Sequence, residues 1–255
     1  MLKVQRLEQI QEELQKHGVL SIEALAEALH VSQSTIRRDL FELEEQGEVL
    51  KRIRGGAVRK ALNTSHEPSF DVRQDMFLEE KQRIALAAKA LVNENETLFL
   101  DSGTTVCELA KVLDSFHQLY IATNDLKSAM VLTQFPSIDL MVLGGSLRRD
   151  HYSLNGYFTE TMIGQIHADK VFLGVDAIDP NIGFMNFSAV EVKSKKMMME
   201  ASYEKIVLCD HSKFERIAFV NICRFEDIDL IITGREASPD TLHTFEDRGV
   251  TIMTV

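Results

Sequence analysis

The most informative part of this sequence runs Val31-Ser32-Gln33-Ser34-Thr35-Ile36-Arg37-Arg38-Asp39-Leu40 and continues, after Gly47, as Lys51-Arg52-Ile53-Arg54-Gly55-Gly56-Ala57. The first run predicts a helix that begins after Ser32, because Ile36, Leu40 and Leu43 recur at helical spacing as one apolar stripe. Burying that stripe turns polar and basic side chains of the first two turns outward, where they can donate to base edges and phosphates. The second run is basic and glycine-ended, as expected of a hairpin along a phosphate backbone.

The residues before this stretch supply a scaffold for it. Residues 3–16 carry apolar residues on one helical face, and Ser21 caps a second, short helix that His30-Val31 ends in a tight turn. A helix, a short helix, a turn, a third helix and a basic hairpin describe a winged helix-turn-helix over residues 1–60. The residues that we expect to face DNA are Ser32, Gln33, Ser34, Thr35, Arg37, Arg38, Lys51, Arg52 and Arg54.

Charge is distributed unevenly along the chain. The formal net charge is −11, yet residues 1–60 hold ten basic and ten acidic residues, and the remainder holds 18 basic against 29 acidic. Residues 51–60 contain five basic residues and no acid. Because phosphates attract the basic strip and repel an acidic domain, this balance favours one DNA-facing module over a chain that wraps nucleic acid.

Cysteine and histidine spacing argues against metal and disulfide chemistry. Cys107, Cys209 and Cys223 lie far apart without Cys-x-x-Cys spacing, and the eight histidines lack paired ligand spacing. We therefore expect free thiols in a reducing cytoplasm, with no metal site and no cofactor. The chain begins with a charged amphipathic segment and has no stretch of membrane-spanning length, so we expect a soluble cytoplasmic protein without a membrane partner.

The second part of the chain shows the pattern of an α/β domain. A polar, Pro-containing segment at 61–71 predicts a linker, and residues 72–255 then form the larger domain, beginning with a helix from about Val72. Short apolar runs alternate with helical stretches, which predicts a largely parallel sheet with flanking helices. The predicted strands are 97–100, 119–123, 140–143, 170–175, 206–209, 230–233 and 250–253, with an edge strand at 217–220.

Polar residues follow several of these strands, at the edge where parallel sheets bind ligands. Asp101-Ser102-Gly103-Thr104-Thr105 opens a helix, so its free N–H groups and hydroxyls suit a phosphate, although alone it is also typical of an ordinary helix cap. Polar or small residues likewise follow the strands at 119–123, 140–143, 170–175 and 206–209. Their recurrence at one edge indicates a convergent site for an anion and a polyol.

Both halves of the chain resemble the DeoR family of bacterial transcriptional regulators. The matching motifs are Leu25-Ala26, Val31-Ser32, Thr35 to Leu40, Gly55-Gly56-Ala57, Leu100 to Thr105, Thr123-Asn124, Leu143-Gly144-Gly145, Ala168-Asp169-Lys170, Phe172-Leu173-Gly174 and Asp210 to Phe214. The resemblance implies a second domain similar in fold to ribose-5-phosphate isomerase that binds phosphorylated sugars or related metabolites. It implies effector contacts at Asp101, Ser102, Gly103, Thr104, Thr105, Asn124, Gly145, Asp176 and Lys213.

One helix departs from the family pattern. Glu191 and Lys195 match a family Glu and Lys that line the site or stabilise it, but Lys193 stands between them where many members carry an acid. The substitution changes the local charge, so the effector cannot be named from the resemblance.

Three functions remain open at this point. The favoured one is a DNA-binding regulator, a repressor of a sugar-metabolism operon, in which a phosphorylated sugar alters how a homodimer or homotetramer presents its recognition helices to double-stranded operator DNA. The second is an isomerase-like enzyme with a DNA-binding appendage, in which Asp101, Asp176, Glu191 and Lys213 would serve proton transfer. The third is an oligomerisation platform without a ligand. No base-and-partner spacing demands turnover, so no residue is assigned a catalytic role.

Overall fold

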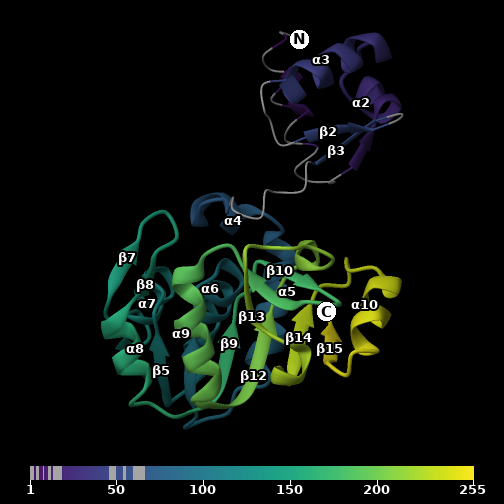
Figure 1. Ribbon diagram of the computed structural model, residues 1–255. Helices are drawn as coiled ribbons and strands as arrows, with labels where there is room; N and C mark the ends of the chain where they lie inside the picture. The colour runs from purple at the N-terminus through teal and green to yellow at the C-terminus, as the bar shows by residue number, and fades with distance from the viewer. Residues whose placement is uncertain are drawn as a thin grey trace. The chain divides into compact units, whose positions relative to one another are not determined.

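The computed structural model describes residues 3, 6–7, 9–10, 13, 19–45, 50–53, 56–59 and 67–255, with the side chains of 19–20, 44–45, 50–53 and 56–59 left out. The chain divides into two compact units, residues 1–66 and 67–255 (Figure 1). Residues 67–71, which the sequence placed in the linker, belong to the second unit, where the Phe70 amide donates to the Asp150 carbonyl at 2.7 Å. Arg54 lies outside the described residues.

Two capped helices form the centre of the first unit, as the sequence predicts. They are α2 (Ile22–Ala28) and α3 (Gln33–Glu45). The Ser21 hydroxyl accepts from the Ala24 amide at 3.0 Å, and the Ser32 hydroxyl accepts from the Thr35 amide at 3.2 Å. His30 takes a left-handed conformation with φ 51° in the turn between them. Serine caps and a left-handed turn residue are what a tight helix-turn-helix requires.

An ion pair reinforces the small apolar core of this unit. Ile10, Leu25 and the α3 stripe are buried together. The Asp39 side chain is only 2% exposed, and its carboxylate accepts two hydrogen bonds from the Arg6 guanidinium. Nε donates to Oδ2 at 2.5 Å, and Nη2 donates to Oδ1 at 3.1 Å. Asp39 is the acid of the Arg-Arg-Asp motif, so one residue of that motif fastens α3 to the preceding helical segment while its neighbours stay exposed.

A three-stranded antiparallel sheet completes the unit and confirms the predicted wing. Its strands are β1 (Val19–Ser21), β2 (Leu50–Ile53) and β3 (Gly56–Arg59), in the order β1-β3-β2. The sequence predicted the β2–β3 hairpin but not β1, which is too short to show an alternating pattern.

The second unit is built on a seven-stranded sheet in which every neighbouring pair is parallel, so the predicted α/β fold class is confirmed. The strand order is β15-β14-β12-β9-β4-β5-β6. The strands are β4 (Thr97–Leu100), β5 (Leu119–Thr123), β6 (Ile138–Val142), β9 (Ala168–Leu173), β12 (Ser202–Leu208), β14 (Leu230–Thr233) and β15 (Thr251–Thr254).

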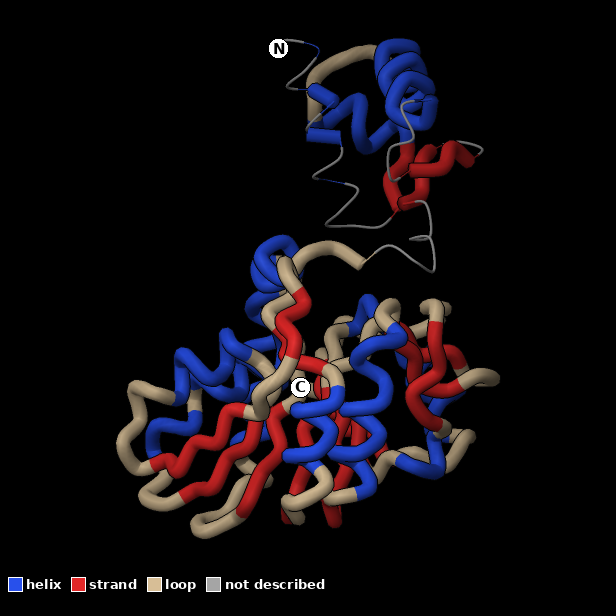
Figure 2. Tube along the Cα trace, turned by 60° about the vertical axis from the view of Figure 1, so that its left-hand side comes forward, coloured by secondary structure: helices blue, strands red, loops and turns tan. Residues whose placement is uncertain are grey.

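Helices cover both faces of this sheet (Figure 2). Leu98 and Leu100 of β4 face one apolar core and Phe99 faces the other, as alternation along a strand requires. The first core is shared with α5 (Leu78–Lys89), α6 (Thr104–Lys111) and α7 (Leu126–Leu132). The second is shared with α8 (Tyr157–Ile163), α9 (Ala189–Glu200) and α10 (Pro239–Glu246). Strands covered on both faces explain why the apolar runs do not alternate with polar residues.

Shorter elements lie outside the main sheet. They are α4 (Phe70–Asp75), a hairpin of β7 (Ser146–Arg148) and β8 (Ser153–Asn155), and a small sheet of β10 (Ala177–Asp179), β11 (Gly183–Asn186) and β13 (Val220–Cys223). The edge strand predicted at 217–220 is wrong. The strand begins at Val220 and pairs with β11, because a short, partly exposed run does not reveal its partner.

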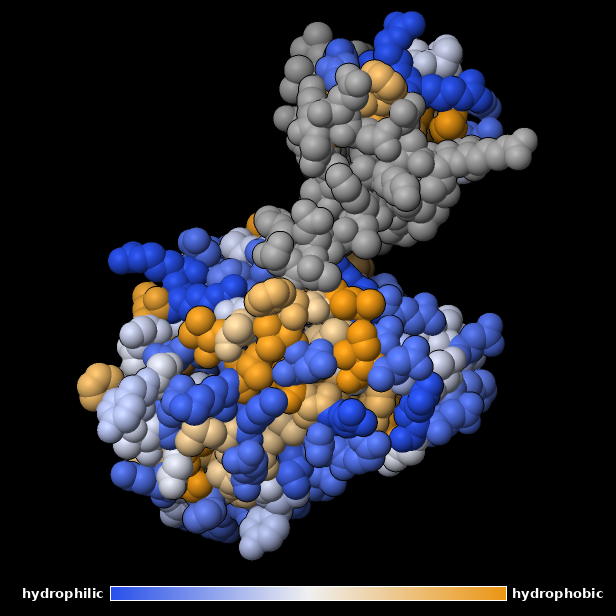
Figure 3. Space-filling view, viewed as in Figure 1, coloured by the Kyte–Doolittle hydropathy of each residue, from blue (hydrophilic) through white to orange (hydrophobic). Residues whose placement is uncertain are grey.

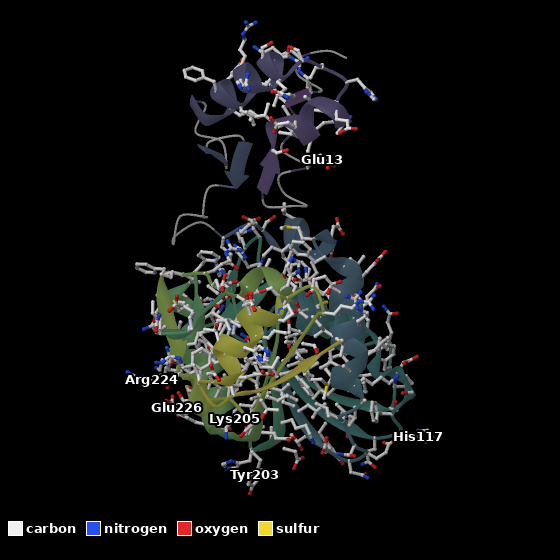
Figure 4. The ribbon with its side chains drawn as sticks, turned by 90° about the vertical axis from the view of Figure 1, so that its right-hand side faces the viewer. Glu13, His117, Tyr203, Lys205, Arg224 and Glu226 are labelled. Atoms are coloured by element: carbon white, nitrogen blue, oxygen red, sulfur yellow. The ribbon has the colours of Figure 1, made fainter. Side chains whose placement is uncertain are left out.

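The strand order reverses between β4 and β9. The chain moves outward from β4 to β5 and β6, and β9 then starts the other half of the sheet beside β4. In open parallel sheets, ligands bind beyond the carboxyl ends of the strands at such a switch point. The opposite, amino-terminal edge is marked by His117 and Tyr203 (Figure 4).

Replacing Asp39 by alanine should loosen the first unit. We expect about 2 kcal/mol less protection of the α3 amides from exchange. The change removes two hydrogen bonds to a charged group and leaves the Arg6 guanidinium without this partner. Hydrogen exchange of residues 33–45 in the full chain measures the loss. Lys3→Ala, which breaks the more exposed pair with Glu42, is the control and should cost under about 1 kcal/mol. Equal protection in both variants would show that the Arg6–Asp39 pair does not hold α3.

Candidate functional site

A pocket lies where the ends of β4 and β9 meet. Its free volume is about 30 Å³, little more than the space for a water molecule. It is lined mostly by polar and charged side chains from six segments of the chain. They are Glu67, Arg73, Ser102, Gly103, Thr104, Thr105, His151, Gly174, Val175, Asp176, Asn186, Glu191, Lys195, Leu208 and Lys213.

Close backbone contact between the two strand ends shapes the pocket floor. A Cβ added to Gly174 would lie 2.9 Å from the Ser102 carbonyl oxygen, so no larger residue fits without moving the backbone. Gly103 has φ 155° and precedes α6 as its N-cap without a side-chain hydrogen bond. The first-turn amides of α6 therefore have no side-chain cap at a point where Thr104 and Thr105 line the pocket.

A buried ion pair lies beneath this floor. Lys195 of α9 binds the Asp101 carboxylate and donates to the Gly174 carbonyl at 2.9 Å, while the Gly174 amide donates to Asp101 Oδ2 at 3.0 Å. Burial alone would lower the pKa of Lys195, but the neighbouring Asp101 and Glu191 carboxylates outweigh it and raise that pKa above its usual value. Both side chains are at most 3% exposed, so the pair joins α9 to the ends of β4 and β9.

Glu67 carries the carboxylate at the centre of the pocket's ion-pair network. Its Oε1 lies 2.9 Å from Arg73 Nη2 and 3.1 Å from His151 Nδ1, and its Oε2 lies 2.6 Å from Arg148 Nη2. Burial opposes ionisation of Glu67, yet His151, Arg73 and Arg148 together lower its pKa to about 2. The network therefore holds an ionised carboxylate inside the pocket at neutral pH.

Two further acids face the same arginines. Asp176 Oδ1 lies 3.3 Å from Arg73 Nη1, and its Oδ2 accepts from the Phe187 amide at 3.0 Å. Glu191 Oε1 lies 3.2 Å from Arg148 Nη1, and its Oε2 accepts from Asn186 at 2.8 Å. Burial raises the pKa of Asp176, with the Glu67 charge adding to the effect.

One lysine lines the pocket from the segment after β12, and a second, on α5, contacts the pocket residue Arg73. Lys213 ends a short 3-10 turn (His211–Lys213), and its ammonium pairs with none of the described carboxylates within 4.0 Å. Lys81 donates to the Arg73 carbonyl, and burial lowers its pKa to about 8. Buried Asp210 caps the turn by accepting from the Ser212 amide at 3.0 Å. Lys213 thus brings to the pocket a positive charge that is not paired with any carboxylate in the described part of the chain.

The structure brings together six of the nine residues predicted to contact an effector. They are Ser102, Gly103, Thr104, Thr105, Asp176 and Lys213. Asp101 lies beneath them in its ion pair. Asn124 does not line the pocket and donates instead to the Leu154 carbonyl at 3.2 Å. Gly145 is packed so closely that an added Cβ would lie 2.1 Å from Thr159 Oγ1. Both follow strands on the β5–β6 side, one and two places beyond β4.

Sequence reasoning missed Glu67, Arg73 and His151 as pocket residues. Glu67 fell in the predicted linker, and Arg73 fell in the helix predicted from about Val72, to which no binding role was given. One signal in the sequence was the presence of three charged residues, Glu67, Asp71 and Arg73, within seven residues of the predicted linker and the helix that follows it. Buried charged side chains need partners, and the partners of Glu67 and Arg73 on other elements lie 78 to 103 residues away.

The predicted DNA-facing residues on α3 are accessible. Ser32, Gln33, Ser34, Arg37 and Arg38 are exposed, and Thr35 is half-buried. Arg37 donates to Gln33 Oε1 at 3.2 Å across one helical turn. Lys51 and Arg52 lie in β2, and their side chains are outside the described part of the chain.

Metal binding and membrane insertion find no support in the described part of the chain. It contains no cluster of three or more acidic, histidine or cysteine side chains that could hold a metal ion. None of its helices combines the length and the apolar character needed to cross a bilayer.

Comparison with protein families gives a match to each unit. Residues 6–61 match the DeoR-like helix-turn-helix domain, and residues 76–235 match the DeoR C-terminal sensor domain. The HTH-type transcriptional regulator GolR of Listeria innocua is 32% identical over 99% of this chain and 98% of its own length. The glycerol-3-phosphate regulon repressor of Escherichia coli K12 is 33% identical over 98% of each chain. The chain belongs to the DeoR family.

Membership in the DeoR family makes this chain a DNA-binding transcriptional regulator. The alternative of an isomerase-like enzyme is not favoured, because the relatives are named as regulators and repressors. Among solved structures, ribose 5-phosphate isomerase A from Methanocaldococcus jannaschii has a TM-score of 0.39 and 18% identity over 52% of this chain and 53% of its own.

Breaking the Asp101–Lys195 pair should destabilise the sensor domain of this DeoR-family chain. Asp101→Ala leaves the Lys195 charge buried without its partner, and we expect a loss of about 3–5 kcal/mol in urea unfolding. Glu236→Ala, which breaks the partly exposed pair with Arg83, should cost under about 1 kcal/mol. If the two variants unfold alike, the buried pair does not fix the strand ends.

Proposed function

We propose that this DeoR-family regulator represses a sugar-metabolism operon and that a phosphorylated sugar or related metabolite changes its operator affinity by binding the pocket between β4 and β9. The observation that carries the proposal is that the first turn of α6 lacks a side-chain cap where it meets the pocket. Arg73 and Lys213 line the same pocket. Helix N-termini favour anions because their free N–H groups and the helix dipole both point toward the ligand.

The two sides of the pocket suit the two chemical parts of a sugar phosphate. The α6 amides, the hydroxyls of Ser102, Thr104 and Thr105, the Lys213 ammonium and the Arg73 guanidinium can surround a phosphate. Asp176 and Asn186 offer acceptors and a donor for sugar hydroxyls. Two relatives named glycerol-3-phosphate regulon repressor support a phosphorylated effector of this class. This pairing of a phosphate end and a polyol end requires no cofactor.

The exposed face of α3 is the proposed recognition surface. Arg38 and Ser34 are four residues apart, so both project from the same side of the helix, and Arg suits bidentate contact with guanine. Lys51, Arg52 and Arg54 of the wing would contact phosphates, which fixes orientation without reading sequence. A regulator that binds operator DNA works where that DNA lies, and we propose that this is the cytoplasm.

Operator recognition should need more than one copy of the chain. One recognition helix reads few base pairs, and such modules act as dimers on half-sites about 34 Å apart. We propose that the second unit supplies the contact between copies in a homodimer or homotetramer. Apolar side chains gather on the face of that unit seen in Figure 3.

Arg38→Ala should weaken binding to the cognate operator by about 1–3 kcal/mol and relax base preference at one position, because it removes a base-edge contact. Arg52→Ala is the matched comparison. It should weaken all duplexes alike and flatten the dependence of affinity on salt, because it removes a phosphate contact. Fluorescence-anisotropy titrations with operator and scrambled duplexes at several salt concentrations distinguish the two. Parental operator binding by Arg38→Ala would refute the assignment of α3.

Lys213→Ala should lose the response to effector while keeping operator binding. Removing one charge-assisted hydrogen bond to a phosphate should weaken effector binding about 10- to 100-fold. Thermal shift with a panel of sugar phosphates and glycerol 3-phosphate, with product analysis, identifies the ligand and detects any turnover. Lys205→Ala, on the opposite edge of the sheet (Figure 4), is the control and should respond as the parent does. Equal effector affinity in both variants would place the phosphate elsewhere.

A further inference from the structure

The pocket proposed for the effector already contains a negatively charged side chain, the Glu67 carboxylate. The Glu67 side chain is 4% exposed and contacts three basic side chains at 2.6–3.1 Å. Arg73 comes from α4, Arg148 from β7 and His151 from the turn after it. Two segments far apart in the sequence, residues 67–75 and the β7–β8 hairpin, thus meet at one carboxylate.

This arrangement has the donor chemistry of a site for an external phosphate or carboxylate. Arginine forks match both groups, and a partly desolvated pair of arginines requires a counter-charge. Without Glu67, the two arginines would keep only Asp176 and Glu191, each of which also accepts hydrogen bonds from neighbouring groups. Arg73 Nε is also buried with no hydrogen-bond partner among the described residues, so one donor of the fork remains unused.

The space in the pocket supports the same conclusion. About 30 Å³ is free while Glu67, Arg73 and His151 line the pocket together, whereas small-molecule pockets measure about 300–1,000 Å³. A sugar phosphate therefore enters only if a side chain moves out. Glu67 is the one lining residue at the very start of the second unit, so it can move without disturbing a strand or helix of the sheet.

We propose that Glu67 is an internal ligand of the pocket and that an anionic group of the effector displaces it from Arg73, Arg148 and His151. This inference rests on the proposed function, namely that the pocket binds a phosphorylated metabolite. It adds the mechanism of competition and identifies which residue yields to the ligand.

Displacement of Glu67 can affect the DNA-binding unit because Glu67 lies directly after the last residue of that unit. Residue 66 ends the first unit, and Glu67 is the first residue of the second. The next fixed point is the Phe70 amide, bound to the Asp150 carbonyl at 2.7 Å. Releasing residues 67–69 lengthens the connection between the units by up to about 10 Å, since each extended residue spans at most about 3.5 Å. A longer connection changes how the two units constrain each other on an operator.

The test compares Glu67→Gln with Asp71→Asn in the full chain. Gln keeps the size of the side chain but removes the charge, whereas Asp71 lies in the same short segment and pairs outside the pocket with Lys127. Inorganic phosphate and glycerol 3-phosphate are the probes, followed by thermal shift and by hydrogen exchange at residues 67–75. Operator affinity is measured on the same samples.

We expect Glu67→Gln to bind inorganic phosphate at least tenfold more tightly than the parent and Asp71→Asn. It should also exchange the Ser69 amide faster without ligand and shift operator affinity in the direction that effector shifts the parent. In the parent, bound ligand should speed exchange at residues 67–70.

Two results would overturn the inference. If ligand protects Thr104 and Thr105 in the parent without changing exchange at 67–70, and Glu67→Gln binds it no better than Asp71→Asn, then Glu67 is not displaced and the proposed function stands. If neither probe nor any sugar phosphate stabilises the parent or the variants, no anion replaces Glu67 and the proposed function fails too.

Discussion

The buried ion pair between Asp101 and Lys195 is the interaction on which the sensor domain depends most. It joins α9 to the two strand ends at the switch point, and Gly174 contributes both its amide and its carbonyl to the same cluster. Because charges in an apolar interior are costly unless paired, the geometry of this pair tolerates little change. The Gly174 backbone that holds this pair also lies against Ser102 and Gly103, at the start of α6 and on the pocket floor.

Charged residues have different roles in the two units. The recognition helix exposes Arg37 and Arg38 but buries Asp39 in its pair with Arg6, so adjacent residues of one motif serve binding and folding separately. In the second unit, the network of Glu67, Arg73 and Arg148 keeps ionised groups inside a pocket that has little room for water. Such a network is stable only while every charge has a partner, so an incoming anion can compete with the carboxylate already there.

Local pattern reveals much of this architecture, and its failures have physical causes. All seven strands of the main sheet are predicted to within four residues, because strands covered on both faces form uninterrupted apolar runs. The hairpin β7–β8 and strand β1 escape notice because three-residue strands carry too little periodicity. Strand-end polarity finds Ser102 to Thr105, Asp176 and Lys213, but also Asn124 and Gly145, which follow strands farther from the switch point. Only the strand order separates these two groups.

The most direct test of this account measures operator affinity of the full chain with phosphorylated metabolites and their unphosphorylated counterparts, side by side. The account predicts that at least one sugar phosphate changes operator affinity by about 5- to 150-fold, the usual range of allosteric coupling. Its unphosphorylated counterpart should have no effect at the same concentration, because the α6 N-terminus and Lys213 would have no anion to bind. Equal effects of both compounds, or no effect of any phosphorylated compound, would contradict the account.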